Sequence, residues 1–114
     1  MIAVVWQFEV QDGKQHEFED FYGVDGPWTA ISRRSRSFLG SSFLKDLAQP
    51  SRYLVVEYWS EMLVYERHHA DFENEVTTLE RRRDALVKSM LPLGLFNALD
   101  VPDRAGPTWS QRSR

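Results

Sequence analysis

The spacing of hydrophobic residues predicts the first elements of the fold. From residue 2 to residue 10, strongly apolar positions alternate with less apolar ones, and a period of two is typical of a β-strand. The more apolar face carries Ile2, Val4, Trp6, Phe8 and Val10. The stretch from Lys14 to Tyr22 has aromatic residues three and four positions apart, which indicates an amphipathic helix.

This helix is followed at once by a break. The stretch GVDGP, residues 23–27, combines two glycines with a proline, and such residues interrupt helices. Proline suits the first turn of a helix, so we expect a second helical segment to begin at Pro27. Asp25 is expected to cap that segment, and Trp28 follows immediately.

The middle of the chain predicts two strands and one long helical stretch. We expect strands over residues 38–46 and 53–59, and the second is nearly continuous in apolar residues, as central strands are. From Glu61 to about Met90, residues spaced three and four apart form one helical stripe: Tyr65, His69, Phe72, Val76, Leu79, Arg83, Leu86 and Met90. Whether this stretch breaks near Asn74 stays open.

The order of the expected elements predicts the fold. After a final short strand over residues 91–99, the order is β-α-β-β-α-β, which is that of a ferredoxin-like α+β sandwich. Right-handed crossovers would place the first and third strands side by side and parallel, with the helices on one face of the sheet. We expect one domain over residues 1–99 and a C-terminal tail over residues 100–114.

Composition narrows the class of protein. Hydrophobic residues make up 42% of the 114 residues, which is enough for a core, and the absence of cysteine excludes disulfides and thiolate metal sites. The net charge of −3 speaks against nucleic-acid binding. No apolar stretch approaches the ~20 residues of a membrane span, and the start does not read as a secretory signal, so we expect a cytoplasmic protein. His68 and His69 diverge on a helix, so no metal site is expected.

Four segments together resemble one known superfamily. They are YGVDGPW at residues 22–28, FLGSSFLKD at 38–46, RYLVVEYWS at 52–60, and the pair Tyr65-Glu66. In this order and spacing the chain resembles the antibiotic biosynthesis monooxygenase superfamily over about residues 2–99. The broken first helix resembles an uncharacterised subgroup of that superfamily.

The resemblance implies both an assembly and a chemistry. Members of this superfamily are dimeric α+β barrels, and they include oxygenases of aromatic polyketides, quinol oxygenases and haem-degrading enzymes. The Asn, Trp and His used by the haem-degrading branch would fall at Trp6 or Gln7, at His68 and near residues 76–78, and none matches. The resemblance therefore implies a reaction without haem, metal or flavin cofactor.

The break in the first helix predicts where a pocket would lie. It would turn the second half of the helix away from the sheet, which opens a cleft beside Tyr22 and Trp28. Trp6 would form the sheet-side floor, and Tyr65 would add a further wall. His68, one turn after Tyr65, is expected to border the cleft as a catalytic base, since histidine titrates near neutral pH. A second interpretation makes Trp28 a core residue and Asp25 a helix cap, and not a catalytic acid.

Three hypotheses of function remain open at this point. The first is a cofactor-independent monooxygenase that acts on a small aromatic substrate, a quinol or a polyketide-like phenol. The second is a non-catalytic dimeric module that binds a small hydrophobic ligand in the same pocket. The third is a structural dimer with a closed cleft, since one fold hosts many functions.

The sheet predicts how two copies would associate. The helices can cover only one of its faces, yet Ala3 and Val5 lie on the other, and the third strand is apolar on both faces. An exposed patch of this kind favours a homodimer through the sheet faces. Trp109 is the large apolar residue of the tail, and we expect it to anchor the tail on the partner subunit.

Overall fold

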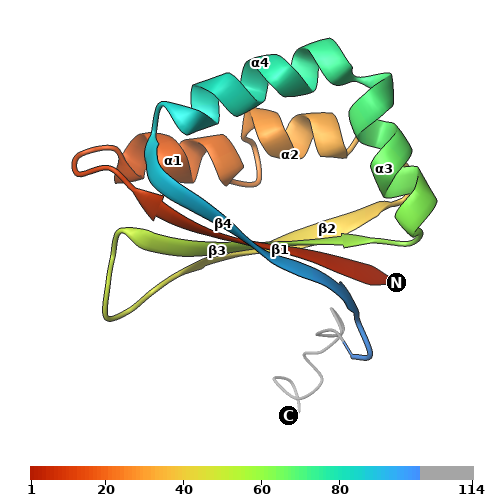
Figure 1. Cartoon of the computed structure of the whole chain (residues 1–114), viewed down its shortest axis with the longest axis horizontal. Coiled ribbons are helices and arrows are strands. Elements are labelled where there is room, and N and C mark those ends of the chain that lie inside the picture. Colours follow the sequence, from red (N-terminus) through yellow and green to blue (C-terminus); the bar gives the residue numbers. More distant parts are fainter. Residues whose placement is uncertain (101–114) are drawn as a thin grey trace.

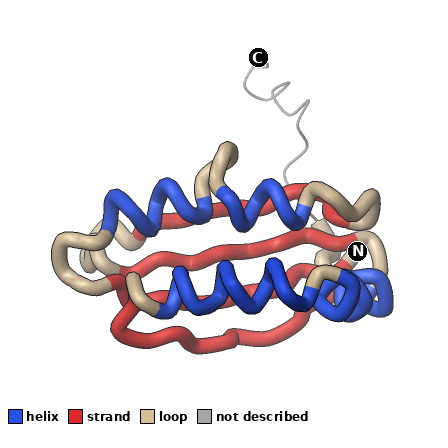
Figure 2. Tube along the Cα trace, turned by 90° about the horizontal axis from the view of Figure 1, so that it is seen from above, coloured by secondary structure: helices blue, strands red, loops and turns tan. Residues whose placement is uncertain are grey.

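The computed structural model describes residues 1–100. Its elements are β1 (Ile2–Val10), α1 (Gln15–Tyr22), α2 (Pro27–Ser32), β2 (Phe38–Lys45), β3 (Arg52–Trp59), α3 (Met62–Asp71), α4 (Glu73–Asp84) and β4 (Val87–Asn97). Figure 1 shows the helices gathered on one side of the sheet, and Figure 2 shows them from above as two rows over the strands. The ferredoxin-like α+β fold expected from the element order is confirmed. The tail after residue 100 and the expected contact of Trp109 lie outside the described residues.

The direction of the central strand pair differs from expectation. The sheet order is β2-β3-β1-β4, so β1 and β3 are neighbours, but they run antiparallel. The prediction of a parallel pair is therefore wrong. The crossover through α1 and α2 returns β2 in the direction of β1 but one place further along the sheet. The hairpin from β2 then reverses the chain, and β3 fills the gap in the opposite direction.

The break between α1 and α2 is a tight turn packed against the end of α1. A Cβ atom on Gly26 would lie 2.3 Å from the carbonyl oxygen of Asp20 and 2.4 Å from that of Phe21, so the site has no room for a side chain. Gly26 itself is the N-cap of α2, and no side chain bonds to the cap, so the expected cap by Asp25 is wrong. Instead the Thr29 hydroxyl donates a hydrogen bond of 2.9 Å to the carbonyl oxygen of Gly23.

The second helical region divides at Phe72, which lies between α3 and α4. The helix then ends at Asp84, and β4 begins at Val87, so the strand is longer than expected and takes in Met90. The prediction of a helix as far as about Met90 is therefore wrong, because the helix ends at Asp84. Residues 87–90 pair instead with the edge of β1, which would otherwise carry unpaired backbone groups.

The core lies between the helices and the sheet. It is formed by Phe8, Val10, Phe18, Phe21, Tyr22, Trp28, Ile31, Tyr53, Val55, Val76 and Leu86. On the opposite face of the sheet no helix of the described chain covers the side chains. Leu44, Leu91 and Phe96 lie on that face and are 49%, 52% and 50% exposed. The sandwich therefore leaves one apolar sheet face open.

Candidate functional site

A pocket of about 160 Å³ lies on the helix side of the sheet, next to the break between α1 and α2. All the strands but β2, and every helix, contribute to its walls. The lining residues are Trp6 on β1, Tyr22 on α1, Trp28 on α2, Glu57 on β3, Tyr65 and His69 on α3, Glu80 and Arg83 on α4, and Met90 on β4. Such a mixture of aromatic walls and a few convergent polar groups is the usual form of a small-molecule site.

The structure brings together four of the five residues singled out from sequence. Trp6, Tyr22, Trp28 and Tyr65 all line this pocket, whereas His68 does not. Trp28 is also a core residue, since only 8% of it is exposed and it packs 6.2 Å from the ring of Phe21. The two interpretations of Trp28 are therefore compatible, because one face of a buried indole forms part of the pocket wall.

The positions of the two histidines are the reverse of those expected, since His68 is packed in the interior and His69 borders the pocket. His68 is 4% exposed and packs between the rings of Trp59 and Phe72, at 5.2 and 5.0 Å. Burial lowers the pKa of its imidazole, and its Nε2 has no hydrogen-bond partner within residues 1–100. His69 borders the pocket, with its ring 5.0 Å from Tyr65 and 6.3 Å from Trp28.

The reason for this exchange is the direction of α3. Because the helical stretch breaks at Phe72, α3 leaves the line of α4 and descends at one end of the sheet (Figure 1). The face that it turns toward Trp59 therefore differs from the face that a straight helix would present. The placement of His68 at the cleft, which assumed one stripe along the whole stretch, is corrected by this geometry.

The most deeply enclosed polar group of the pocket is a residue that the sequence analysis missed. Glu57 is 4% exposed, and both carboxyl oxygens accept indole hydrogen bonds. Trp28 Nε1 donates to one oxygen at 2.6 Å, and Trp59 Nε1 donates to the other at 3.1 Å. Burial raises the pKa of this carboxyl, and the two indole hydrogen bonds act in the opposite direction. The signal in the sequence was Glu57 itself, in register with Tyr53 and Val55 on the buried face of β3.

The same pocket is also lined by a buried cation, Arg83. Arg83 is 6% exposed, and its guanidinium lies 5.7 Å from the ring centroid of Trp28. It forms an ion pair of 3.0 Å with Asp84. Burial raises the pKa of Tyr22, an effect that the neighbouring Arg83 charge opposes, and burial raises the pKa of Tyr65 to about 12. Both phenols are therefore neutral hydrogen-bond donors at pH 7.

A family model described as antibiotic biosynthesis monooxygenase matches residues 1–73. The chain belongs to the antibiotic biosynthesis monooxygenase family. The matched segment runs from β1 to the end of α3, and it therefore includes the helix break and most of the pocket wall. Among curated proteins, none matches the sequence.

Solved structures of similar shape agree with this family assignment at the level of the fold. A mutant of SnoaB, a cofactor-independent oxygenase from Streptomyces nogalater, is 22% identical, with a TM-score of 0.68 over 88% of this chain and 94% of that one. PA3566 from Pseudomonas aeruginosa is 16% identical, with a TM-score of 0.64 over 87% and 94%. A NIPSNAP family protein from Agrobacterium tumefaciens is 15% identical, with a TM-score of 0.65 over 87% and 93%.

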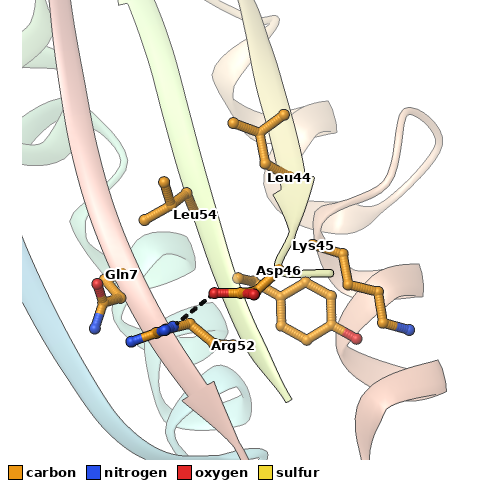
Figure 3. A pocket seen from close by; sticks show the side chains of 7 residues that line it. Gln7, Leu44, Lys45, Asp46, Arg52 and Leu54 are labelled. Atoms are coloured by element: carbon orange, nitrogen blue, oxygen red, sulfur yellow. Dashed lines mark hydrogen bonds and ion pairs between the residues drawn. The ribbon is translucent and has the colours of Figure 1, made fainter. Parts of the chain in front are cut away.

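A second, larger hollow of about 300 Å³ lies on the open face of this family member's sheet, beside the end of the β2–β3 hairpin. Figure 3 shows Gln7, Leu44 and Leu54 among the side chains that line it, and a dashed line joins Arg52 to Asp46. These two residues form an ion pair of 3.0 Å. It lies on the face where we expect a second copy, whereas the pocket beside the helix break is walled by the helices and the sheet of one chain. The pocket beside the helix break is therefore the better candidate for chemistry.

Two other kinds of site are missing from the part of the chain that the structure describes. Within residues 1–100, no three or more His, Cys, Asp or Glu residues gather as they would around a metal ion. None of the helices in that range is both long and apolar enough to cross a membrane.

Proposed function

We propose that this protein is a cofactor-independent monooxygenase whose substrate is a single-ring, electron-rich phenol such as a hydroquinone. Family membership supports the reaction class. The observation that carries the proposal is the pocket beside the helix break, where aromatic walls surround a buried acid and a buried cation. That pocket also supports a ligand-binding function over a purely structural dimer with a closed cleft.

The size of the pocket supports a single ring over a polycyclic polyketide. Its volume is about 160 Å³. An engineered protein cavity of about 150 Å³ binds benzene, so one substituted ring fills a space of this size. A substrate of three or four fused rings would need the helices to move apart. We therefore infer that the chain acts on the smaller of the two substrate classes implied by its family.

The proposed reaction balances without a cofactor. A hydroquinone and one O₂ give a hydroxyquinone and one water, and the substrate supplies all four electrons that O₂ takes up. Such a reaction starts from the substrate phenolate, which reacts with O₂ more readily than the phenol. Arg83 lines the pocket with a positive charge that would stabilise that anion, and the rings of Trp6 and Trp28 line it with aromatic surface.

Oxygen consumption tests this proposal. We expect the purified protein, treated with a chelator, to accelerate oxygen uptake by hydroquinone and methylhydroquinone above the uncatalysed rate. With ¹⁸O₂, one labelled atom should enter the quinone and the other should appear in water. If no hydroquinone of a broad panel is oxidised faster than in buffer alone, the proposal is wrong. Tight binding of the same hydroquinones in air, without oxygen uptake, would instead support the non-catalytic ligand-binding module.

The protein is further proposed to act as a homodimer through the open sheet face. Val5 and Val56 are cross-strand partners on that face, and Leu91 and Phe96 on β4 extend the same apolar surface. Two-fold packing covers such a face in a self-complementary way. It would leave the pocket on the helix side accessible in both copies.

A further inference from the structure

Glu57 is the buried acid of the pocket wall, and it lies on β3, one of the two central strands of the sheet. Its carboxyl is buried, yet it also lines the pocket beside Trp28. Carboxylates seldom lie in the interior unless they are paired, and here the partners are two neutral indoles and not a cation. The protein therefore places an ionisable group on β3, a central strand, without an ion pair to neutralise it.

The two indole bonds leave this carboxylate able to accept more hydrogen bonds. A carboxylate has about four acceptor sites, and the bonds from Trp28 and Trp59 use one site on each oxygen. Both bonds hold the carboxyl plane in a fixed orientation. A free acceptor site on a fixed carboxylate at a pocket wall is what a substrate hydroxyl requires.

Several other ionisable groups line the same pocket. They are Tyr22 from α1, Tyr65 and His69 from α3, and Glu80 and Arg83 from α4. Burial raises the pKa of both phenols, so they remain protonated, and a guanidinium is only a donor. Glu80 and His69 are only partly buried, whereas Glu57 is 4% exposed and is held in place by two hydrogen bonds.

We propose that Glu57 is a catalytic residue that accepts the hydroxyl hydrogen of the phenolic substrate, first as a hydrogen-bond acceptor and then as a base. This inference rests on the proposed function. In the step, the O–H bond of the substrate breaks, its electron pair stays on the substrate oxygen, and the proton binds a carboxylate oxygen of Glu57. The resulting phenolate is stabilised by Arg83 and reacts with O₂, and the proton leaves later with the water that forms.

The first experiment measures binding and needs no turnover. The probes are 4-fluorophenol and 1,4-difluorobenzene, which have nearly the same shape but differ in the O–H group, and ¹⁹F NMR follows both. The wild-type protein should prefer the phenol by about tenfold or more, because its O–H binds a charged acceptor. Lowering the pH should weaken the preference as Glu57 becomes protonated, because a neutral acceptor binds the O–H less strongly than a charged one. Glu57→Gln should weaken the preference severalfold but keep the affinity for difluorobenzene, and the exposed control Glu66→Gln should change neither.

A second variant keeps the test valid if Glu57→Gln folds poorly. Trp59 donates to Glu57 but does not line the pocket, so Trp59→Phe removes one bond that favours the carboxylate. The preference for 4-fluorophenol should then weaken at a higher pH than in the wild type, with an unchanged affinity for difluorobenzene. A residue with only a structural role would not shift this pH dependence.

The second experiment measures turnover of hydroquinone and of the more acidic 2,5-dichlorohydroquinone. A substrate that ionises more easily depends less on a base. Glu57→Gln should therefore lower the turnover rate of hydroquinone by a factor at least about ten times larger than that for the dichloro compound. If Glu57→Gln keeps the preference for 4-fluorophenol, or slows both hydroquinones equally, the inference is wrong while the monooxygenase proposal stands. If the binding results hold but the wild type turns over no hydroquinone, the monooxygenase proposal fails, and Glu57 remains the acceptor for the ligand hydroxyl.

Discussion

Replacing Gly26 by alanine tests whether the helix break is a packed turn or only a flexible one. The backbone angles of Gly26, φ −77° and ψ 163°, are ordinary for alanine. By backbone entropy alone the change would stabilise the protein by about 0.4–1 kcal/mol. The new Cβ, however, would lie 2.3 and 2.4 Å from two carbonyl oxygens of α1, far inside van der Waals contact. The two effects have opposite signs, so the sign of the measured change decides between them.

The magnitude follows from the nature of the atoms that would clash. Overpacking costs about 1–3 kcal/mol, and the upper end applies here because backbone oxygens cannot move aside as a side chain can. After subtraction of the entropy term, we expect Gly26→Ala to destabilise the protein by about 2 kcal/mol. For a domain of this size that corresponds to a fall of about 8 °C in melting temperature.

Urea and thermal unfolding followed by circular dichroism measure this change. Gly23→Ala is the matched comparison, because its Cβ would meet a carbonyl oxygen at 2.9 Å and should cost less. We expect the order of stability to be wild type, then Gly23→Ala, then Gly26→Ala. A Gly26→Ala protein as stable as the wild type would refute the argument that the break is held by close backbone packing.

Three further predictions concern the histidine, the buried acid and the open sheet face. The pKa of His68 is lowered in the folded protein, so the contribution of neutral His68 to the stability is complete above the usual pKa of 6.5 and is lost as the pH falls below it. His68→Leu should remove this part of the acid sensitivity, as measured by urea unfolding at different pH values. The pKa of Glu57 is raised above 4.5, so stability should fall as the pH rises from 4.5 through the raised value and then level off, and Glu57→Gln should flatten this fall. Val56→Glu on the open face should give a compact monomer in sedimentation experiments; a wild-type monomer at micromolar concentration would contradict the dimer proposal.

Much of the fold could be predicted because periodicity reports local geometry. The alternation over residues 2–10 coincides with β1, and the glycines and proline located the break between α1 and α2. Errors arose where a distant part of the chain decides the outcome. The direction of β3 depends on which gap in the sheet it fills, and residues 87–90 form a strand because the edge of β1 is available. The hydrophobic spacing within one segment shows neither the direction of β3 nor the presence of a free strand edge beside residues 87–90.

The candidate site shows the same division between local and distant information. Trp6, Tyr22, Trp28 and Tyr65 were placed together because each adjoins the helix break or faces it from an element of known direction. The choice of His68 over His69 failed, since it required the angle between α3 and α4. That angle depends on tertiary packing around Phe72, where the helix divides.

Glu57 was missed for a different reason, since the sequence did contain its signal. The run YLVVEYW was interpreted by its average hydrophobicity, which identified a central strand and hid the one charged position in it. In an alternating strand, residues 53, 55, 57 and 59 share a face, and that face is buried throughout in the structure. A carboxyl on such a face is costly, so a fold retains it only with hydrogen-bond donors at hand, and the indoles of Trp28 and Trp59 are those donors. The helix break is what brings Trp28 within reach of β3, so the interruption of the first helix and the buried acid belong to the same site.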